Sequence, residues 1–393
     1  MVKLTLLLVW VGFFLRLAIA FVNGFIGPTY GASDDSFGFH LNAVRFSNGL
    51  GVEVFTLSHV YSYILGIFYS IITDSLFLGS ALSVLGWLAS AFILVRIMRI
   101  LSFKMSIQWR VMLIYALIPT SIMYTGITLR EPFQLLFINL ALYAALKIYF
   151  YRSIAHWLVL LLAAVGMGVL HGALLVSGIF MIVGTLFLIT SRNRKGVSFT
   201  KVVLVTPIVI LCLFYGFSLF TSFTSYGGRL DDGLSIAVQA YQEGILSSAY
   251  NARANYRTEV AINDGLGGLI LSIPSFLFQY LFEPMPWKMS SIVDVVALLE
   301  NMLRFWLIWN ALKYLVGSYR NKPMFVAHNY FGHERCILFV FLSYLIMETI
   351  WSLGTSNWGT ASRHHLPSLG LLLVASFAYR NVTSPKYNHS LKS

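Results

Sequence analysis

Two adjacent carboxylates, Asp34 and Asp35, are the first residues of the chain whose type and setting suggest chemistry. They lie in the segment GASDDSFGFHLNAVRFSNGLGVEV, where Phe37 and Leu41 can share one apolar face. At a water–lipid boundary, partial desolvation raises the basicity of a carboxylate and suits it to deprotonate a hydroxyl nucleophile. The structural alternative is that both aspartates, with Ser33 as N-cap, only stabilise the start of an interfacial helix.

A second charged pair, Arg130 and Glu131, follows an apolar run in YTGITLREPFQLLFINLALYAALK. Pro132 comes next and favours the first turn of a helix, so Glu131 could simply cap that helix. Ionisable residues near a membrane-embedded cavity are costly and are functional candidates by default. In that case Glu131 binds an acceptor or a divalent metal such as Mg or Mn, with Asp35 as a second ligand, and Arg130 faces a phosphate.

Three consecutive basic or titratable residues, Arg363, His364 and His365, precede the last apolar run in GTSNWGTASRHHLPSLG. Arginine offers a planar fork for a phosphate, and histidine can be protonated beside an anion. They are therefore candidates for binding a lipid phosphate, and the alternative is a simple anchor to anionic headgroups.

The segment 221–265 is rich in Tyr, Asn, Gly and charges of both signs. Aromatic faces with planar polar partners can recognise sugars, although any ordered interfacial loop has a similar composition. Arg253 and Arg257 are its candidate acceptor-binding residues.

The elements that position these residues follow from composition. Of 393 residues, 58% are hydrophobic and 11% charged, and the mean hydropathy is +0.76. Because soluble proteins are about one-quarter charged, this composition excludes a soluble fold and predicts an all-α, polytopic transmembrane helical bundle. The net charge of +12 comes from basic clusters between apolar runs, which indicates cytoplasmic loops and not nucleic-acid binding. The two cysteines suggest neither a disulfide framework nor a zinc site.

Apolar runs of about 20 residues predict the spanning helices. The strong candidates are 4–26, 80–99, 110–126, 132–151, 155–170, 173–190, 200–220, 292–316, 335–353 and 365–379. Two weaker runs, 57–76 and 266–282, bring the total to roughly 10–12 apolar helices in a single membrane domain, 1–393. The first run carries Arg16 and lacks an A-x-A cleavage site, so we expect it to be a retained helix.

The sidedness follows from the positive-inside rule. Basic clusters fall inside only if 57–76 and 266–282 do not cross the bilayer. Pro274 interrupts the second of these runs, in keeping with that assignment. The N-terminus and the tail 380–393 are then cytoplasmic, whereas loops 27–56 and 221–265 and the candidate residues lie outside.

The order of these features resembles the C-type glycosyltransferases (the GT-C superfamily), membrane enzymes that use polyprenyl-phosphate sugars. Asp35, Phe39 and Ala43 are similar to the acidic residue of the family's first external loop and its neighbours. Pro119 followed by TGITLREPFQLL aligns Glu131 with a second acidic position. GTASRHHLPSLGLLLVA is similar to the closing segment G-x-x-x-R-Y-x-L-P-x-x-P-x-L and aligns Arg363 and Pro367. His364 stands where Tyr is usual, and the second proline is missing.

The resemblance implies an inverting transferase that moves a sugar from a polyprenyl-phosphate-linked donor to a glycan, lipid or protein acceptor in cell-envelope polysaccharide assembly. It places the protein in the bacterial inner membrane with its active site outside. Asp35, with Asp34 second, would be the general base. Arg363, helped by His364, His365 and Arg130, would neutralise the departing lipid phosphate.

Two other readings stay open. An O-antigen or exopolysaccharide polymerase would use Arg253 and Arg257 as catalytic residues. A transporter or lipid-linked sugar flippase would need essential charges inside the membrane, for which Arg16, His171 and Glu348 are the candidates. Glu300 and Arg304, four residues apart, are expected to pair with one another.

Overall fold

The structure is a computed structural model that describes residues 2–32, 35–51, 59–192, 254–255, 265–320 and 331–382. Within these ranges the chain is helical, and the β-type pairing found there is an isolated bridge between Asn255 and Asn357. The main helices are α1 (Val2–Phe21), α2 (Asp35–Ser47), α3 (Val60–Ile71), α4 (Leu76–Ile100), α5 (Met105–Leu117), α6 (Pro119–Thr125), α7 (Glu131–Tyr151), α8 (Ala155–Leu170), α9 (Gly172–Arg192), α12 (Gly265–Phe282), α13 (Ile292–Arg320), α15 (Phe331–Gly354), α16 (Trp358–His364) and α17 (Leu369–Val382). A π-helical turn, η1 (Val22–Ile26), extends α1.

Five helical stretches are long and apolar enough to cross a bilayer. They are Val2–Ile26, Leu76–Ile100, Glu131–Tyr151, Gly172–Thr190 and Glu334–Gly354. The all-α membrane class is therefore confirmed, and the chain is an integral membrane protein. Shorter apolar helices occur at Val60–Ile71, Ala155–Leu170, Leu271–Phe282 and Leu369–Ala378. The predicted span 200–220 and most of the tail 380–393 lie outside the described residues.

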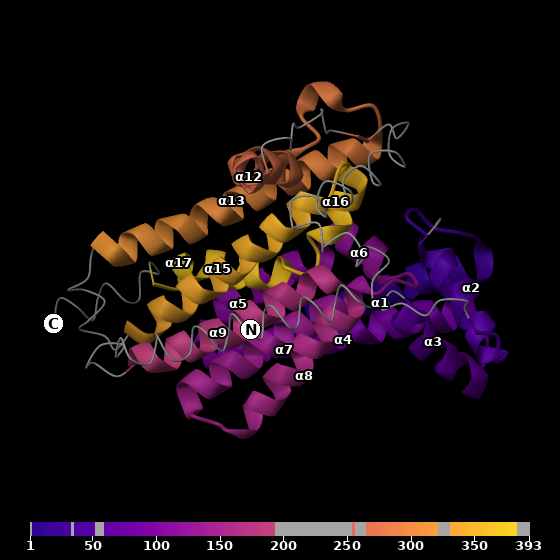
Figure 1. The fold of residues 1–393 in the computed structure, drawn as a ribbon, viewed down its shortest axis with the longest axis horizontal. Coiled ribbons are helices and arrows are strands. Elements are labelled where there is room, and N and C mark those ends of the chain that lie inside the picture. Colours follow the sequence, from indigo (N-terminus) through magenta and orange to yellow (C-terminus); the bar gives the residue numbers. More distant parts are fainter. Residues whose placement is uncertain are drawn as a thin grey trace.

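The region 27–75 starts and ends at the same end of the bundle. Asn23 Nδ2 in η1 donates to Ser80 Oγ, 3.2 Å away, near the start of α4. The 12 residues of α3 span about 18 Å, too little for a hydrocarbon core of about 30 Å. Figure 1 shows α2 and α3 side by side at the right, at what we call the α2 end of the bundle. This geometry agrees with a non-crossing 57–76 segment.

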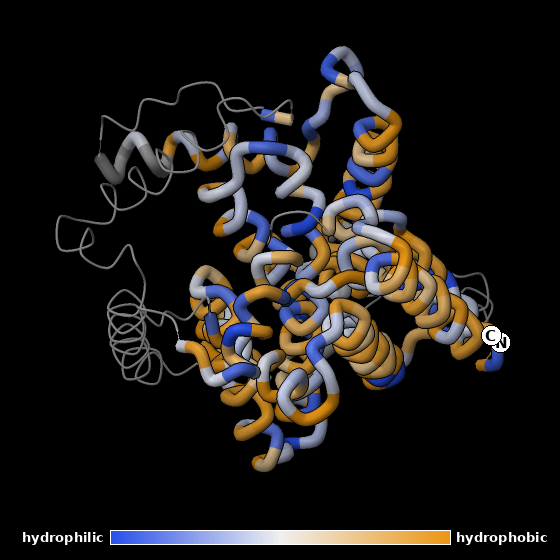
Figure 2. The backbone as a smooth tube through the Cα atoms, turned by 90° about the vertical axis from the view of Figure 1, so that its right-hand side faces the viewer, coloured by the Kyte–Doolittle hydropathy of each residue, from blue (hydrophilic) through white to orange (hydrophobic). Residues whose placement is uncertain are grey.

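The second non-crossing candidate, 266–282, forms α12, which contains Pro274. In Figure 1 α12 is seen end-on, whereas α13 and α15 are seen lengthwise. A helix that lies across its neighbours does not run with the bundle, which agrees with the expectation for this segment. Figure 2, which looks onto the α2 end, shows mostly hydrophobic residues along the helices and hydrophilic residues grouped between them.

The predicted continuous span 110–126 is wrong, because Pro119 divides it into α5 and α6. Proline has no N–H and forces the preceding residue, Ile118, into an extended conformation (ψ 123°). In an unbroken helix the Ala116 carbonyl would accept from the Thr120 N–H. The break prevents this hydrogen bond, so each of the two groups needs another partner.

Two charged residues from other helices satisfy the groups that the break leaves unpaired. Arg16 Nη1 of α1 donates to the Ala116 carbonyl oxygen at 2.8 Å. Glu300 of α13 accepts from the Thr120 backbone N–H at 3.0 Å and from the Thr120 hydroxyl at 2.5 Å. The structure thus explains both charges as partners of the broken helix, and Glu300 faces Thr120 and not the expected Arg304.

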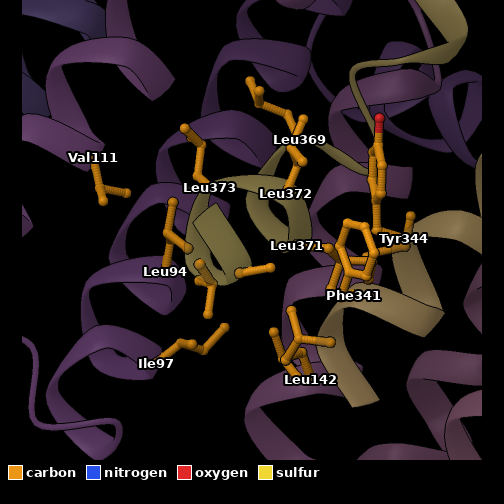
Figure 3. Packing of buried hydrophobic residues seen from close by; sticks show 14 of the residues in the cluster. Leu94, Ile97, Val111, Leu142, Phe341, Tyr344, Leu369, Leu371, Leu372 and Leu373 are labelled. Atoms are coloured by element: carbon orange, nitrogen blue, oxygen red, sulfur yellow. The ribbon is translucent and has the colours of Figure 1, made fainter. Parts of the chain in front are cut away.

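The core lies where α4, α7, α15 and α17 meet. Leucine and aromatic side chains fill it, as Figure 3 shows for Leu94, Leu142, Phe341 and Leu372. Lipid tails are as apolar as these side chains, so this core is stabilised by close van der Waals packing between the helices. This packing fixes the spacing of the helices and so the positions of the loops at the α2 end.

The sidedness of the bundle gives a direct test. In a chain whose Cys212 and Cys336 are replaced by alanine, a cysteine at exposed Asp74, at the α2 end, should react with a membrane-impermeant maleimide on intact cells. A cysteine at exposed Arg152, which follows α7 at the opposite end, should react only after the cells are permeabilised. Reversed labelling would contradict the expected orientation.

Candidate functional site

Three residues that the sequence singles out, Asp35, Glu131 and Arg363, meet at the α2 end. Arg363 Nη1 donates to Asp35 Oδ2 at 2.5 Å, and Arg363 Nε lies 2.9 Å from Glu131 Oε1. The second contact is an ion pair whose N–H is not aligned for a hydrogen bond. The guanidinium thus bridges two carboxylates from segments far apart in the chain.

The two carboxylates differ strongly in exposure. The side chain of Asp35 is 52% exposed, whereas that of Glu131 is 2% exposed. Burial alone would lower the pKa of Arg363, but the charges of Glu131 and Asp35 outweigh it, so its pKa is raised. Arg363 therefore stays a cation, with one buried carboxyl group beneath it and one at the surface.

A small apolar cluster positions Asp35. Ala32, just before α2, packs with Tyr124, Ile127 and Leu366, and Phe39 of α2 packs against the same group. Because Leu366 follows Arg363 closely in the chain, this cluster joins the segments that carry the cation and the exposed carboxylate. Their approach is therefore set by hydrophobic packing as well as by charge.

Gly31 makes this packing possible. Its φ is +80°, a conformation that L side chains rarely adopt, and an added Cβ would lie 2.7 Å from Tyr124 Cε1. We expect Gly31→Ala to lower the free energy of unfolding by about 1–2 kcal/mol through backbone strain alone. The substitution should also displace Asp35 from Arg363.

The matched control is Gly27→Ala in the same loop, because nothing lies within 4 Å of an added Cβ there. Thermal unfolding in detergent measures the difference between the two variants. Equal melting temperatures for both would contradict the proposed role of Gly31.

Glu131 begins α7 and is held from the preceding turn. The Ser83 hydroxyl of α4 donates to the Leu129 carbonyl oxygen at 3.1 Å and fixes that turn. Glu131 Oε2 is buried and has no hydrogen-bond partner among the described residues. A buried carboxylate oxygen without a donor costs about 1–3 kcal/mol or more, so a ligand hydroxyl could bind there favourably.

Arg130, the predicted phosphate-binding neighbour of Glu131, points elsewhere. Its Nη1 donates to the Leu170 carbonyl oxygen at 3.1 Å, at the end of α8, and its guanidinium carbon lies 5.5 Å from the centre of the Phe39 ring. Arg130 therefore joins α8 to α2 and is not one of the groups that Arg363 contacts.

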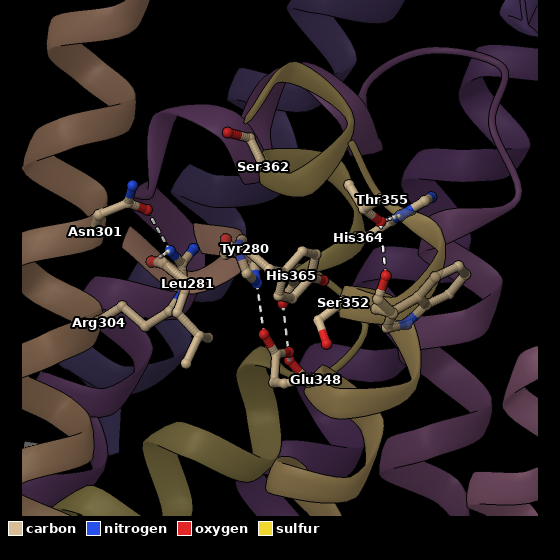
Figure 4. Close-up of polar contacts among 12 residues, drawn as sticks. Tyr280, Leu281, Asn301, Arg304, Glu348, Ser352, Thr355, Ser362, His364 and His365 are labelled. Atoms are coloured by element: carbon tan, nitrogen blue, oxygen red, sulfur yellow. Dashed lines mark hydrogen bonds and ion pairs between the residues drawn. The ribbon is translucent and has the colours of Figure 1, made fainter. Parts of the chain in front are cut away.

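Arg363, His364 and His365 do not form one shared site. Their segment starts with α16, whose N-cap Asn357 accepts from the Thr360 N–H at 2.7 Å. Successive residues on a helix point about 100° apart, so neighbours face different surroundings. Arg363 faces the two carboxylates, while both histidines are buried away from them on different partners (Figure 4).

His364 lies in an aromatic stack. Its ring packs on Trp351 with centroids 4.0 Å apart, and Trp351 in turn contacts His171 at 4.4 Å. The Thr355 hydroxyl lies 3.1 Å from His364 Nδ1. Burial, followed by the charge of Arg363, lowers the pKa of His364 well below its usual value, so the ring is neutral and adds no charge for binding a phosphate.

His365 forms a separate buried pair with Glu348 of α15. Its Nδ1 lies 2.6 Å from Glu348 Oε2, and its Nε2 lies 3.1 Å from the Tyr280 carbonyl oxygen. Because a carbonyl only accepts, Nε2 carries a proton. Ser368 also donates to Glu348. His365 therefore joins α12, α15 and the start of α17, and it does not face Arg363.

A pocket beside this pair is lined by polar and apolar side chains of several helices. The polar ones are Thr120, Glu300, Arg304, Tyr344, His365 and Ser368. Its volume of about 20 Å³ suits one or two water molecules and not a sugar. Arg304 donates to the Leu281 carbonyl oxygen at 3.2 Å and to Asn301, so the expected Glu300–Arg304 pair does not form.

No family model, curated protein or solved structure matches the chain. The function is therefore argued from the contacts of Asp35, Glu131 and Arg363. The other candidates, Asp34, Arg253 and Arg257, lie outside the described residues.

The donor set does not fit the metal site considered from the sequence. Among the described residues no group of three or more His, Cys, Asp or Glu side chains could hold a metal ion. The guanidinium of Arg363 contacts both Asp35 and Glu131.

Sequence reasoning missed Tyr124 and Trp351. Both are buried, Tyr124 under the Gly31 backbone and Trp351 against the rings of His171 and His364. One available signal was the placement of Tyr124 five residues after the helix-breaking Pro119, at the end of a short helix that leads to Glu131. Trp351 gave no comparable signal, because aromatic residues are common in membrane helices.

Proposed function

We propose that the protein is a membrane glycosyltransferase of the GT-C type that takes a sugar from a polyprenyl-phosphate donor. The observation that carries the proposal is the contact of Arg363 with both Asp35 and Glu131. The three segments that resemble motifs of the GT-C superfamily lie far apart in the sequence. Their charged residues nevertheless meet at one end of a membrane bundle. Apolar helices beside this end suit a lipid-linked substrate.

The proposed reaction is a single displacement with inversion. Asp35 accepts the proton of an acceptor hydroxyl, and the hydroxyl oxygen forms a bond to the anomeric carbon of the sugar. The bond between that carbon and the phosphate oxygen breaks, and its electron pair leaves with the lipid phosphate. Arg363 stabilises the negative charge that develops on this phosphate, which is the electrostatic contribution that usually dominates such catalysis.

Glu131 has two roles in this scheme. Its Oε1 balances the charge of Arg363. Its partnerless Oε2 accepts a hydrogen bond from a sugar or acceptor hydroxyl. The expected setting is the bacterial inner membrane with the α2 end outside, where lipid-linked sugars are used in cell-envelope assembly.

The residues proposed for a transporter are engaged in structural contacts. Arg16 donates to the Ala116 carbonyl that the helix break before Pro119 leaves unpaired. Glu348 pairs with His365, and His171 packs on Trp351. This arrangement favours a transferase over a proton- or ion-coupled carrier. The polymerase alternative depends on Arg253 and Arg257, outside the described residues.

The deciding experiment offers the purified, full-length protein polyprenyl-phosphate monosaccharides and lipid-linked oligosaccharide repeat units as separate donors. Transfer from the monosaccharide donor, with release of polyprenyl phosphate, is the expected result. Use of the repeat units alone would instead support a polymerase, and turnover of neither class would contradict the proposal.

A further inference from the structure

Arg363 holds its two carboxylates with unequal strength. The partner of Nε, Glu131, is 2% exposed, and the partner of Nη1, Asp35, is 52% exposed. Exposed ion pairs contribute about 0–1 kcal/mol, whereas removing one partner of a buried pair costs about 3–5 kcal/mol. The contact to Asp35 can therefore exchange, while the contact to Glu131 stays in place.

The contact with Arg363 also restrains the proposed base. Asp35 Oδ2 accepts from Arg363 Nη1 at 2.5 Å. This contact occupies the oxygen that would have to accept the proton of the acceptor hydroxyl. A hydroxyl that arrives at the site alone thus meets a carboxylate already engaged by a cation.

We propose that Glu131 is a positioning residue that fixes Arg363, and that an anionic phosphate ester replaces Asp35 on Nη1 and thereby releases the base. This inference rests on the proposed function and names how the same site is regulated. A phosphate on Nη1 draws the guanidinium away from Asp35 and leaves Oδ2 free to accept the proton of the acceptor hydroxyl. The donor therefore binds before the acceptor, and its phosphate switches on Asp35.

The first test measures binding of farnesyl phosphate, inorganic phosphate and uncharged farnesol to the full-length protein in detergent. Asp35→Asn replaces the charged group that competes with phosphate by a weaker, neutral acceptor, so both anions should bind about five-fold tighter, while farnesol binding should not change. Asp74→Asn is the matched control, because Asp74 is exposed at the same end and is not a partner of Arg363.

The outcomes separate the two proposals. If the wild type binds farnesyl phosphate but Asp35→Asn binds it no tighter, the proposed exchange of Asp35 for phosphate on Arg363 is wrong. The proposed class of donor, a polyprenyl phosphate, then still stands. If Asp74→Asn tightens the binding of farnesyl phosphate as much as Asp35→Asn does, the effect comes from the general loss of negative charge. That result would also overturn the proposed exchange. If the wild type does not bind farnesyl phosphate, the proposed donor class fails and the exchange fails with it.

A second variant tests the positioning role of Glu131. Glu131→Gln removes its charge and leaves Asp35 as the charged partner of Arg363, so farnesyl phosphate should bind at least five-fold weaker. Glu131→Asp, which keeps the charge, should restore part of the affinity. A general loss of negative charge predicts the opposite sign, so tighter binding by Glu131→Gln would overturn the positioning role.

Discussion

Asp35→Asn is expected to lower the rate of sugar transfer by about 10²–10⁴-fold, the usual contribution of a general base. Asparagine keeps the shape of the side chain and can still accept from Arg363, but it cannot take up the acceptor proton. Because Asp35 is 52% exposed, loss of its ion pair should change the free energy of unfolding by no more than about 1 kcal/mol. The measurement is turnover of a polyprenyl-phosphate sugar by the purified variant.

Two controls make the result specific. Asp74→Asn should keep wild-type activity, and the melting temperature of Asp35→Asn should stay close to that of the wild type. Full transfer activity in Asp35→Asn would remove Asp35 from the reaction and leave the buried Glu131 as the remaining carboxylate of the trio.

Arg16→Met is expected to cause the largest loss of stability, about 3 kcal/mol or more. Arg16 is fully buried and donates to Thr125 Oγ1 at 2.6 Å, to the Ala116 carbonyl at 2.8 Å and to Ser121 Oγ at 2.8 Å. Its guanidinium also lies 3.7 Å from the centre of the Trp87 ring. Methionine leaves several of these buried acceptors without a donor, each at about 1–3 kcal/mol.

Arg16→Lys separates charge from geometry. Lysine keeps the positive charge but lacks the planar fork that reaches several acceptors at once, so an intermediate loss is expected. Unfolding in detergent, followed by heat or denaturant, gives the ranking wild type, Arg16→Lys, Arg16→Met. A methionine variant as stable as the wild type would show that Arg16 does not support the break before Pro119.

The scarcity of charge explains why the sequence singled out three residues that meet in the candidate site. In a chain with 11% charged residues, Asp35, Glu131 and Arg363 stand out because each costs free energy near a bilayer. Their mutual contact could not be derived, because it depends on packing of Ala32, Tyr124 and Leu366 across segments with no shared pattern.

The errors have equally specific causes. The sequence grouped Arg363, His364 and His365 by adjacency, although helical geometry sends neighbouring side chains in different directions. The spacing of four residues predicted a pair between Glu300 and Arg304. Glu300 instead accepts from the N–H of Thr120, which the helix break leaves without a carbonyl partner. Hydropathy also joined 110–126 into one span, because an average over a window ignores the effect of Pro119.

The helix break before α6 also sets when the site can form during synthesis. α6 needs Arg16 from the first helix and Glu300 from α13 to satisfy the groups around the break. Arg363 follows Asp35 by 328 residues, so both carboxylates leave the ribosome long before their cation. Until α13 and the segment around Arg363 insert, the nascent chain carries two acidic residues without their cation and a Thr120 N–H without its acceptor. A chain released early would therefore keep these groups unpaired at the α2 end.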